Sequence, residues 1–166
     1  MRTIRSEEVE QAVYRLAEEA CLGIIPSCMQ AIGEAAAREE AGSAAQFALE
    51  TVLLNARTAK AERMPVCQDT GYAVILAEIG QDVHIEGAPL ADAVNGGVRR
   101  AYEDFRFRKS VCDPLTRVNT ADNTPAALHT EIVAGERLRL PFCPRDSAAK
   151  TCRACTCSPP RRACRA

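Results

Sequence analysis

The sequence predicts an α+β fold in which helices come first and short strands follow. Apolar residues recur at helical spacing through residues 6–56. Short apolar runs separated by glycine-containing turns follow after residue 71, and this pattern is typical of strands. A chain of 166 residues is expected to form one domain with a core of its own.

Three helices are expected in the N-terminal third, packed against one another as a bundle. The first begins at Ser6, where two glutamates stand near the positive end of the helix dipole, and it ends at Gly23. Residues 27–30 and 43–46 both have the pattern of a capping box and are predicted to begin the other two helices. The core face of the third helix is predicted from Leu49, Val52, Leu53 and Ala56.

The second half is expected to hold two β-hairpins and one helix. Residues 72–79 and 83–85 flank a turn and predict the first hairpin, and residues 128–133 and 137–140 predict the second. Between them, residues 90–102 return to helical spacing. Gly96 and Gly97 are expected to interrupt that helix, and a long polar loop is expected at 110–124.

Composition excludes several classes of protein. The formal net charge of -1 argues against a general nucleic-acid binder, which normally carries a basic face. The first ten residues lack the apolar region of a signal peptide, and the apolar runs are predicted to be too short for a membrane span. A cytoplasmic protein is therefore expected, without membrane or nucleic-acid partners.

Nine cysteines are unevenly distributed, with four in the first 142 residues and five in the last 24. Without an export signal the thiols are expected to stay reduced, so packing or metal binding is favoured over disulfides. Cys21 and Cys28 lie in helical patterns and are predicted to be small core residues.

The pentapeptide CQDTG, residues 67–71, lies between the helical third and the first expected strand. Taken alone it predicts an ordinary turn, in which Asp69 bonds its own backbone and Gly71 supplies a positive φ. The polar motifs further along the chain change that interpretation. PVCQDTG, FRKS and RVNTADNTPA occur in this order, and together they resemble the α subunit of the iron–sulfur class I fumarase and L(+)-tartrate dehydratase family, with Phe107 in place of a usual leucine.

The resemblance implies a [4Fe–4S] cluster held by three cysteines, of which Cys67 matches the first. Gln68 and Asp69 match residues that contact the substrate, with Asp69 the better candidate for proton transfer. Arg108 matches an arginine that binds a substrate carboxylate through its planar fork. His84 is expected to be a strand residue, and His129 is expected to be packed or to face a turn. Cys112, next to Asp113 and Pro114, lies near the expected site but matches no cluster ligand.

The implied reaction is the reversible addition of water to a small dicarboxylate, either fumarate/malate or tartrate/oxaloacetate. A β subunit or a C-terminal domain, together with homodimerisation, is implied for the intact enzyme. The second and third cluster cysteines find no match, so this chain is expected to be inactive by itself. The alternative is a small metal-binding or interaction module that uses the cysteine-rich tail.

The tail predicts a domain boundary near Leu140, with residues 1–140 forming the N-terminal part of the family domain and residues 141–166 a disordered, non-native tail. Suitable synonymous codons for residues 143–153, read in a shifted frame, spell P-K-G-F-G-S-E-N-M-S. This matches the glycine-rich segment that the family places there. The tail is therefore interpreted as an out-of-frame translation.

Overall fold

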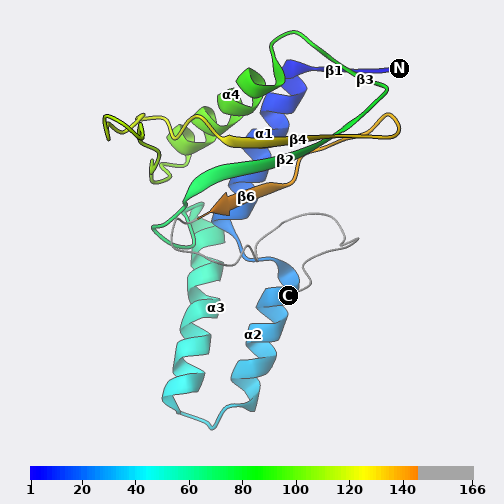
Figure 1. Cartoon of the computed structure of the whole chain (residues 1–166). Coiled ribbons are helices and arrows are strands. Elements are labelled where there is room, and N and C mark those ends of the chain that lie inside the picture. The colour runs from blue at the N-terminus through cyan, green and yellow to red at the C-terminus, as the bar shows by residue number, and fades with distance from the viewer. Residues whose placement is uncertain (146–166) are drawn as a thin grey trace.

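The structure is a computed structural model that describes residues 1–145, and it confirms the α+β class (Figure 1). Helices occupy most of the N-terminal third, and a mixed sheet with one further helix follows. In chain order the elements are β1 (Arg2–Arg5), α1 (Ser6–Leu22), α2 (Pro26–Arg38), α3 (Ala44–Glu62), β2 (Tyr72–Gly80), β3 (Val83–Glu86), α4 (Leu90–Asp104), β4 (Ala127–Val133), β5 (Leu138–Arg139) and β6 (Phe142–Arg145).

Strand β2 is the centre of the larger sheet. On one side it pairs in parallel with β4, and on the other it pairs antiparallel with β5 and β6. Helix α4 lies in the crossover between β2 and β4, as a parallel connection requires. A separate two-stranded parallel sheet is formed by β1 and β3.

The two predicted hairpins are wrong in their pairing, although their strands exist. Strand β3 pairs with β1 instead of with β2. The sequence did not predict β1, because the N-terminus is charged. Strands β4 and β5 lie on opposite sides of β2 instead of beside each other. The turns mark reversals of the chain, but the partner of each strand is decided by which arrangement buries the apolar face of β2.

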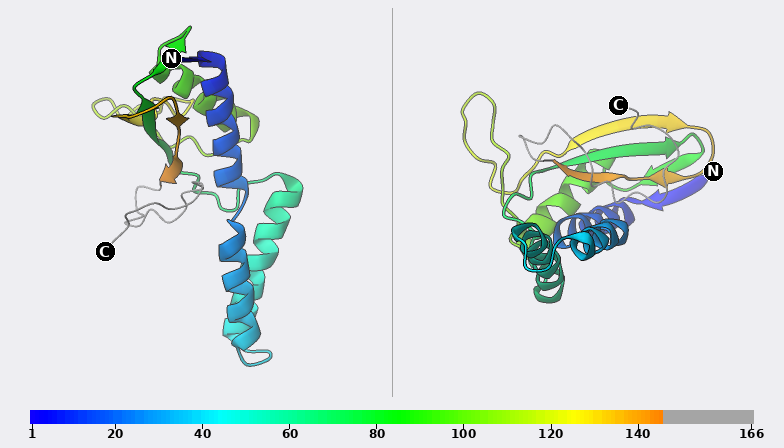
Figure 2. Two further views of the ribbon diagram at one scale, coloured as in Figure 1. Left: turned by 90° about the vertical axis from the view of Figure 1, so that its right-hand side faces the viewer. Right: turned by 90° about the horizontal axis from the view of Figure 1, so that it is seen from below.

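The core lies between one face of β2 and the helices α1 and α4, which pack along each other (Figure 2). Alternate residues of β2 point into it, and the helices contribute small and branched side chains at helical spacing. Its fully buried members include Val9, Val13, Ala73, Ile75, Val94, Val98, Tyr102 and Phe142.

Gly96 and Gly97 do not interrupt α4, contrary to the expectation from sequence. Gly97 instead lies where α4 approaches α1 most tightly. A Cβ atom there would come within 2.5 Å of the backbone oxygen of Glu10 and 2.8 Å of the Cβ of Val13. At Gly96 the nearest atoms belong to the flexible Glu10 carboxyl group, at 3.1 Å. Gly97 is therefore required by packing, while Gly96 is not.

Substitution at these two adjacent glycines should have different effects. Gly97→Ala should lower the free energy of unfolding by about 1–3 kcal/mol, because the added methyl group forces the two helices apart. Gly96→Ala should be neutral or stabilising by up to about 1 kcal/mol, because alanine has the higher helix propensity. Urea unfolding of both variants measures the difference, and equal effects would refute the packing role of Gly97.

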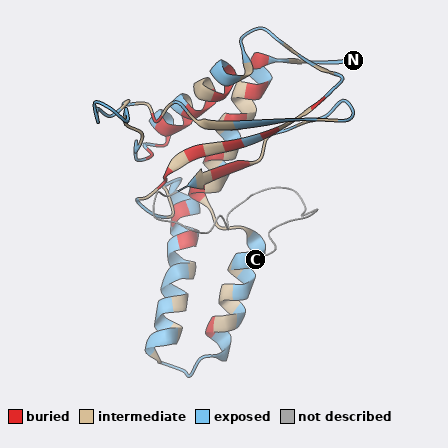
Figure 3. Cartoon of the chain, viewed as in Figure 1, coloured by how far each residue is buried: buried red, intermediate tan, exposed pale blue. Residues whose placement is uncertain are grey.

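Helices α2 and α3 form a hairpin that extends away from the core, so the expected three-helix bundle is wrong (Figures 1 and 3). Within this hairpin only Ala36, Ala56 and Ala59 are buried. The capping box expected at 27–30 is absent, since α2 begins at Pro26 without a side-chain cap. The cap at Ser43 is confirmed, because its hydroxyl accepts a hydrogen bond from the Gln46 amide.

Burial corrects one of the two predictions made for the helical cysteines. Cys21 is buried as predicted, but Cys28 is exposed on the hairpin.

Among the described residues, one segment, Ser6–Arg38, contains an 18-residue window with a mean hydropathy of 1.3, enough by length and composition to cross a membrane. This is weak evidence, because helices that line a protein core pass the same test, and residues 23–25 divide the segment into α1 and α2.

The boundary expected near Leu140 stays a prediction, but the first residues beyond it belong to the described structure. Residues Phe142–Arg145 form β6, which pairs with β2, and the Phe142 side chain is fully buried in the core. The packed part of the chain therefore continues to at least Arg145. The remainder of the predicted tail, and with it the CRACTC motif, lies outside the described residues.

Candidate functional site

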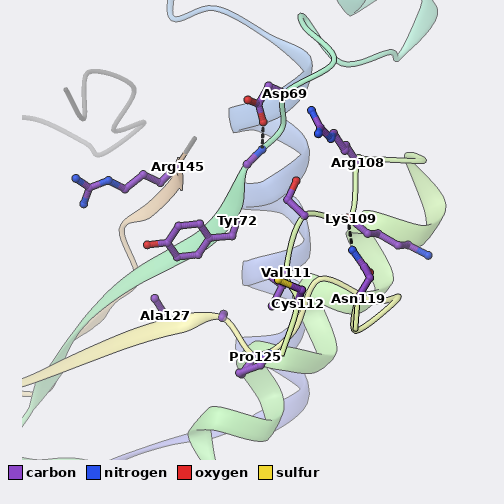
Figure 4. Close-up of a pocket in the computed structure, with 13 residues that line it drawn as sticks. Asp69, Tyr72, Arg108, Lys109, Val111, Cys112, Asn119, Pro125, Ala127 and Arg145 are labelled. Atoms are coloured by element: carbon purple, nitrogen blue, oxygen red, sulfur yellow. Dashed lines mark hydrogen bonds between the residues drawn. The ribbon is translucent and has the colours of Figure 1, made fainter. Parts of the chain in front are cut away.

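A cavity of about 650 Å³ lies where the 67–71 loop enters β2, beside the long loop that follows α4 (Figure 4). Its walls come from three parts of the chain that are far apart in sequence. Lining residues are Asp69, Gly71, Tyr72, Arg108, Lys109, Ser110, Val111, Cys112, Asn119, Pro125, Ala126, Ala127 and Arg145. The downstream polar motifs are thus brought against CQDTG.

The 67–71 loop forms the turn that its local sequence predicts. One carboxylate oxygen of Asp69 accepts a hydrogen bond from the Gly71 amide at 3.2 Å, and Gly71 has a φ of +61°. The Cys67 thiol donates to the Asp69 backbone oxygen at 3.3 Å. These bonds present the half-buried Asp69 to the cavity and leave Cys67 and Gln68 exposed.

Tyr102 on α4 is buried and forms hydrogen bonds with the backbone of this loop. Its hydroxyl lies 3.0 Å from the backbone oxygen of Thr70 and 3.2 Å from that of Gly71, so it donates to these carbonyls. Burial, which removes water from the phenol, raises the pKa of Tyr102 well above its ordinary value. Thr70 in turn donates from its hydroxyl to the Arg108 backbone oxygen at 3.3 Å. The turn is therefore tied to the core and to the opposite wall.

Asn123 joins the two walls of the cavity through its amide group. The Asn123 side-chain oxygen accepts from the amides of Ser110 at 2.7 Å and Val111 at 3.1 Å. The side-chain nitrogen donates to the Gly71 backbone oxygen at 3.3 Å. Asn123 is fully buried and has a φ of +61°, which asparagine tolerates better than most residues. It was present in the quoted motif, but its role depends on contacts that sequence does not display.

The structure brings together two of the four residues predicted for the site. Asp69 and Arg108 line the cavity at the same end, and the Arg108 side chain extends toward the loop that carries Asp69 (Figure 4). Cys67 and Gln68 precede Asp69 in the chain but do not line the cavity. Lys109, Cys112 and Arg145 line the cavity and had been given no role; for Lys109, its place next to Arg108 was the available signal.

Asp122 anchors the long loop to α4. It lies 2.9 Å from the Arg99 guanidinium and accepts from the Thr124 amide at 3.0 Å and the Thr124 hydroxyl at 2.8 Å. Desolvation acts to raise the pKa of Asp122, but the hydrogen bonds from Arg99 and Thr124 and the Arg99 charge outweigh it and lower the pKa to about 2. The ionised carboxylate is therefore favoured in the folded state.

This lowered pKa predicts an acid-dependent loss of stability. The contribution of Asp122 is complete above its ordinary pKa of 3.8 and is lost as the pH falls through about 2, where the folded protein also becomes protonated. Urea unfolding between pH 6 and pH 2 should show this decrease. Asp122→Asn should make the decrease shallower, and an unchanged slope would contradict the assignment.

The described residues do not by themselves supply the set of thiolates for a four-iron cluster. Cys67 is exposed at the end of the loop, as an iron ligand could be. Cys21 lies below it, but burial, with a smaller effect from Cys67, raises the pKa of the Cys21 thiol to about 12, which disfavours the thiolate. Within residues 1–145 no three His, Cys, Asp or Glu side chains are grouped for a metal. His84 and His129 are exposed on strands, away from the cavity.

The α+β scaffold thus presents one carboxylate and several cationic side chains around the cavity. The sequence profile described as "Fumarate hydratase (Fumerase)" matches residues 10–164. The chain belongs to this family, the class I fumarate hydratase and L(+)-tartrate dehydratase α family.

Individual relatives match over part of their length. The chain is 27% identical over 117 residues to a protein of Methanocaldococcus jannaschii named as an L(+)-tartrate dehydratase α subunit, covering 70% of this chain and 41% of that protein. It is 31% identical over 117 residues to the aerobic class I fumarate hydratase of Escherichia coli K12, covering 69% and 21%. It is 34% identical over 92 residues to the mitochondrial fumarate hydratase 1 of Leishmania major, covering 54% and 17%. The chain thus spans less than half of these relatives.

Proposed function

We propose that this chain forms part of the substrate site of a hydro-lyase that adds water to, or removes it from, a small dicarboxylate. Fumarate/malate and tartrate/oxaloacetate are the proposed pairs, since relatives of both names match the chain. The observation that carries the proposal is the cavity between the 67–71 loop and the loop after α4, where Asp69 and Arg108 meet.

The charges around the cavity suit a small dianion. Arg108 and Lys109 are adjacent and both exposed, and Asp69 is the one carboxylate among the lining residues. Arg108 can hold a substrate carboxylate in bidentate fashion, while Lys109 offers a point charge for a second anionic group. Because both side chains start from one loop, they set the orientation of a bound dicarboxylate relative to Asp69.

Asp69 is proposed as the proton-transfer group and Gln68 as a polar contact of the substrate. In Asp69 one oxygen is engaged by the Gly71 amide, which fixes the orientation of the carboxylate. The other oxygen has no such constraint from the turn and can take a proton from carbon next to a bound carboxylate. Cys67 is proposed as one ligand of the cluster, whose other thiolate ligands lie outside residues 1–145. A β subunit or a C-terminal domain is proposed to complete the enzyme. The present chain alone is proposed to be inactive.

Equilibrium binding tests the substrate site without requiring turnover. In isothermal titration calorimetry, fumarate, malate or tartrate should bind the chain more tightly than a monocarboxylate such as lactate. Arg108→Lys should weaken dicarboxylate binding by on the order of 1–3 kcal/mol, because the charge remains but the fork is lost. Arg106→Lys, on an exposed residue that does not line the cavity, is the matched control. Equal binding of mono- and dicarboxylates would refute the proposal.

We further propose that the reading frame changes close to Leu140, so that the segment beyond it is an out-of-frame translation and not the family's own. The family match extends to residue 164 and does not mark this boundary. Nucleotide sequencing around the codons for residues 140–143 tests the idea. A shifted frame without a glycine-rich continuation would refute it.

A further inference from the structure

The loop that follows α4, residues 105–126, carries four cationic residues close to the cavity. Arg108 and Lys109 line the cavity. Arg106 lies two residues before Arg108, and Arg117 lies two residues before Asn119, another lining residue. Because consecutive Cα atoms are about 3.8 Å apart, the Cα atoms of Arg106 and Arg117 lie within about 8 Å of those of lining residues. All four cations are exposed beside the cavity.

The charge of this loop contrasts with that of the whole chain. Four cations and two carboxylates give residues 105–126 a formal charge of +2, whereas the chain has -1. No ion pair within residues 1–145 includes any of the four cations. Of the two carboxylates, Asp113 accepts hydrogen bonds from amides of its own turn, and Asp122 pairs with Arg99. The cavity therefore lies in a positive potential, which attracts small anions.

Buried aromatic rings fix the backbone from which two of these cations start. Phe105 and Phe107 are buried, and their rings stack with a centroid distance of 5.4 Å. Arg106 and Arg108 alternate with these phenylalanines in the sequence and are exposed. The stacked rings therefore anchor the segment in the core and leave both arginines on the solvent side.

Arg106 occupies a position at which glycine is usual. It follows the end of α4 with a φ of +53°. Its amide donates to the Glu103 backbone oxygen at 3.2 Å, and the Phe107 amide donates to that of Tyr102 at 3.1 Å. These two bonds form a Schellman motif, in which the left-handed residue is most often glycine and sometimes asparagine. An arginine at this position costs stability, because its Cβ atom is crowded.

Arg117 has the same left-handed conformation, with a φ of +61°. Arg63, at the end of α3, also has it, but its guanidinium group lies 2.6 Å from the Glu18 carboxylate and 5.5 Å from the ring centroid of Phe105. These contacts account for an arginine at position 63. Arg106 and Arg117 have no ion pair or ring contact of this kind within residues 1–145, so packing does not account for their presence.

We infer that Arg106 and Arg117 are guiding residues, which attract doubly charged carboxylates to the cavity through their charge without lining it. The inference rests on the proposed function and adds two residues to it. A dianion about 10 Å from one arginine in water should bind about threefold more tightly at an ionic strength of about 10 mM. At about 500 mM the gain should almost disappear, because salt screens charges at this separation.

Isothermal titration calorimetry with fumarate, malate and tartrate, at about 10 mM and about 500 mM ionic strength, tests the inference. The double variant Arg106→Asn with Arg117→Asn should weaken dicarboxylate binding about five- to tenfold at the low ionic strength and less than about twofold at the high one. Lactate, with a single charge, should lose only about two- to threefold at the low ionic strength. The midpoint of urea unfolding should rise, because asparagine tolerates the left-handed conformation.

Two matched variants separate the charge from other effects. Arg38→Gln removes one charge from an exposed residue at the far end of the α2–α3 hairpin and should leave binding unchanged (Figure 1). Arg106→Lys with Arg117→Lys keeps both charges and should bind dicarboxylates as the parent chain does.

The outcomes distinguish this inference from the proposed function. If the double asparagine variant binds dicarboxylates as tightly as the parent at low ionic strength, the guiding role is overturned and the proposed function stands. A loss of the same size at both ionic strengths would also overturn it, because such a loss indicates direct contact with the ligand. Equal binding of lactate and the dicarboxylates by the parent chain would refute the proposed function, and the inference with it.

Discussion

Replacing Asn123 with alanine should lower the free energy of unfolding by about 3 kcal/mol, because it leaves two partly buried backbone amides without an acceptor and removes one of the two donors to a buried carbonyl. The amides are those of Ser110 and Val111, and the carbonyl is that of Gly71. Alanine also tolerates the positive φ of this position less well than asparagine does. Chemical denaturation monitored by circular dichroism measures the loss.

Asn119→Ala is the matched control for Asn123. Asn119 also bonds the loop backbone, donating to Lys109 at 2.9 Å and accepting from the Ala121 amide at 2.8 Å, but it is exposed. Water can replace both of its bonds, so its loss should cost about 1 kcal/mol or less. Similar losses at the two asparagines would show that Asn123 does not clamp the cavity walls.

Asp69→Asn should reduce turnover by about 100-fold or more in a longer chain in which this segment is followed by the family's remaining sequence. The test rests on the proposed function. Asparagine keeps a side-chain oxygen that can accept from the Gly71 amide, so the turn should survive while proton transfer is lost. Initial rates with fumarate, malate and tartrate, measured under anaerobic conditions, provide the comparison.

Asp69→Ala separates the two roles of this residue. It removes both the proton-transfer group and the hydrogen bond to Gly71, so it should lower stability as well as turnover. Asp69→Asn should lower turnover alone. An Asp69→Asn enzyme with normal turnover would leave Asp69 with the structural role of an ordinary turn residue and nothing more.

Much of the local structure could be predicted from the sequence because its signals are local. The start at Ser6, the cap at Ser43 and the turn at Asp69–Gly71 depend on residues within one turn of the chain, and all three are confirmed. The combined polar motifs also predicted the family. Their residues are specific in type and order, which does not depend on knowing the fold.

What the sequence by itself did not determine is which elements lie side by side. The helical spacing of α2 and α3 predicted helices, but an apolar face does not state its partner, and in the structure these two helices pack against each other, away from the core. The strands of the expected hairpins are separated because β2 lies at the centre of the sheet and takes partners from both sides.

The tertiary structure alone decided how the site is held together. Asn123 lies 52 residues from Gly71, and Tyr102 lies 31 residues from it, yet both bond the same carbonyl. Gly97 likewise looked like a helix breaker, but the close approach of α1 requires it. In each case the residue's contacts come from segments that are distant in sequence and are brought together when the core forms. A local sequence pattern therefore cannot predict them.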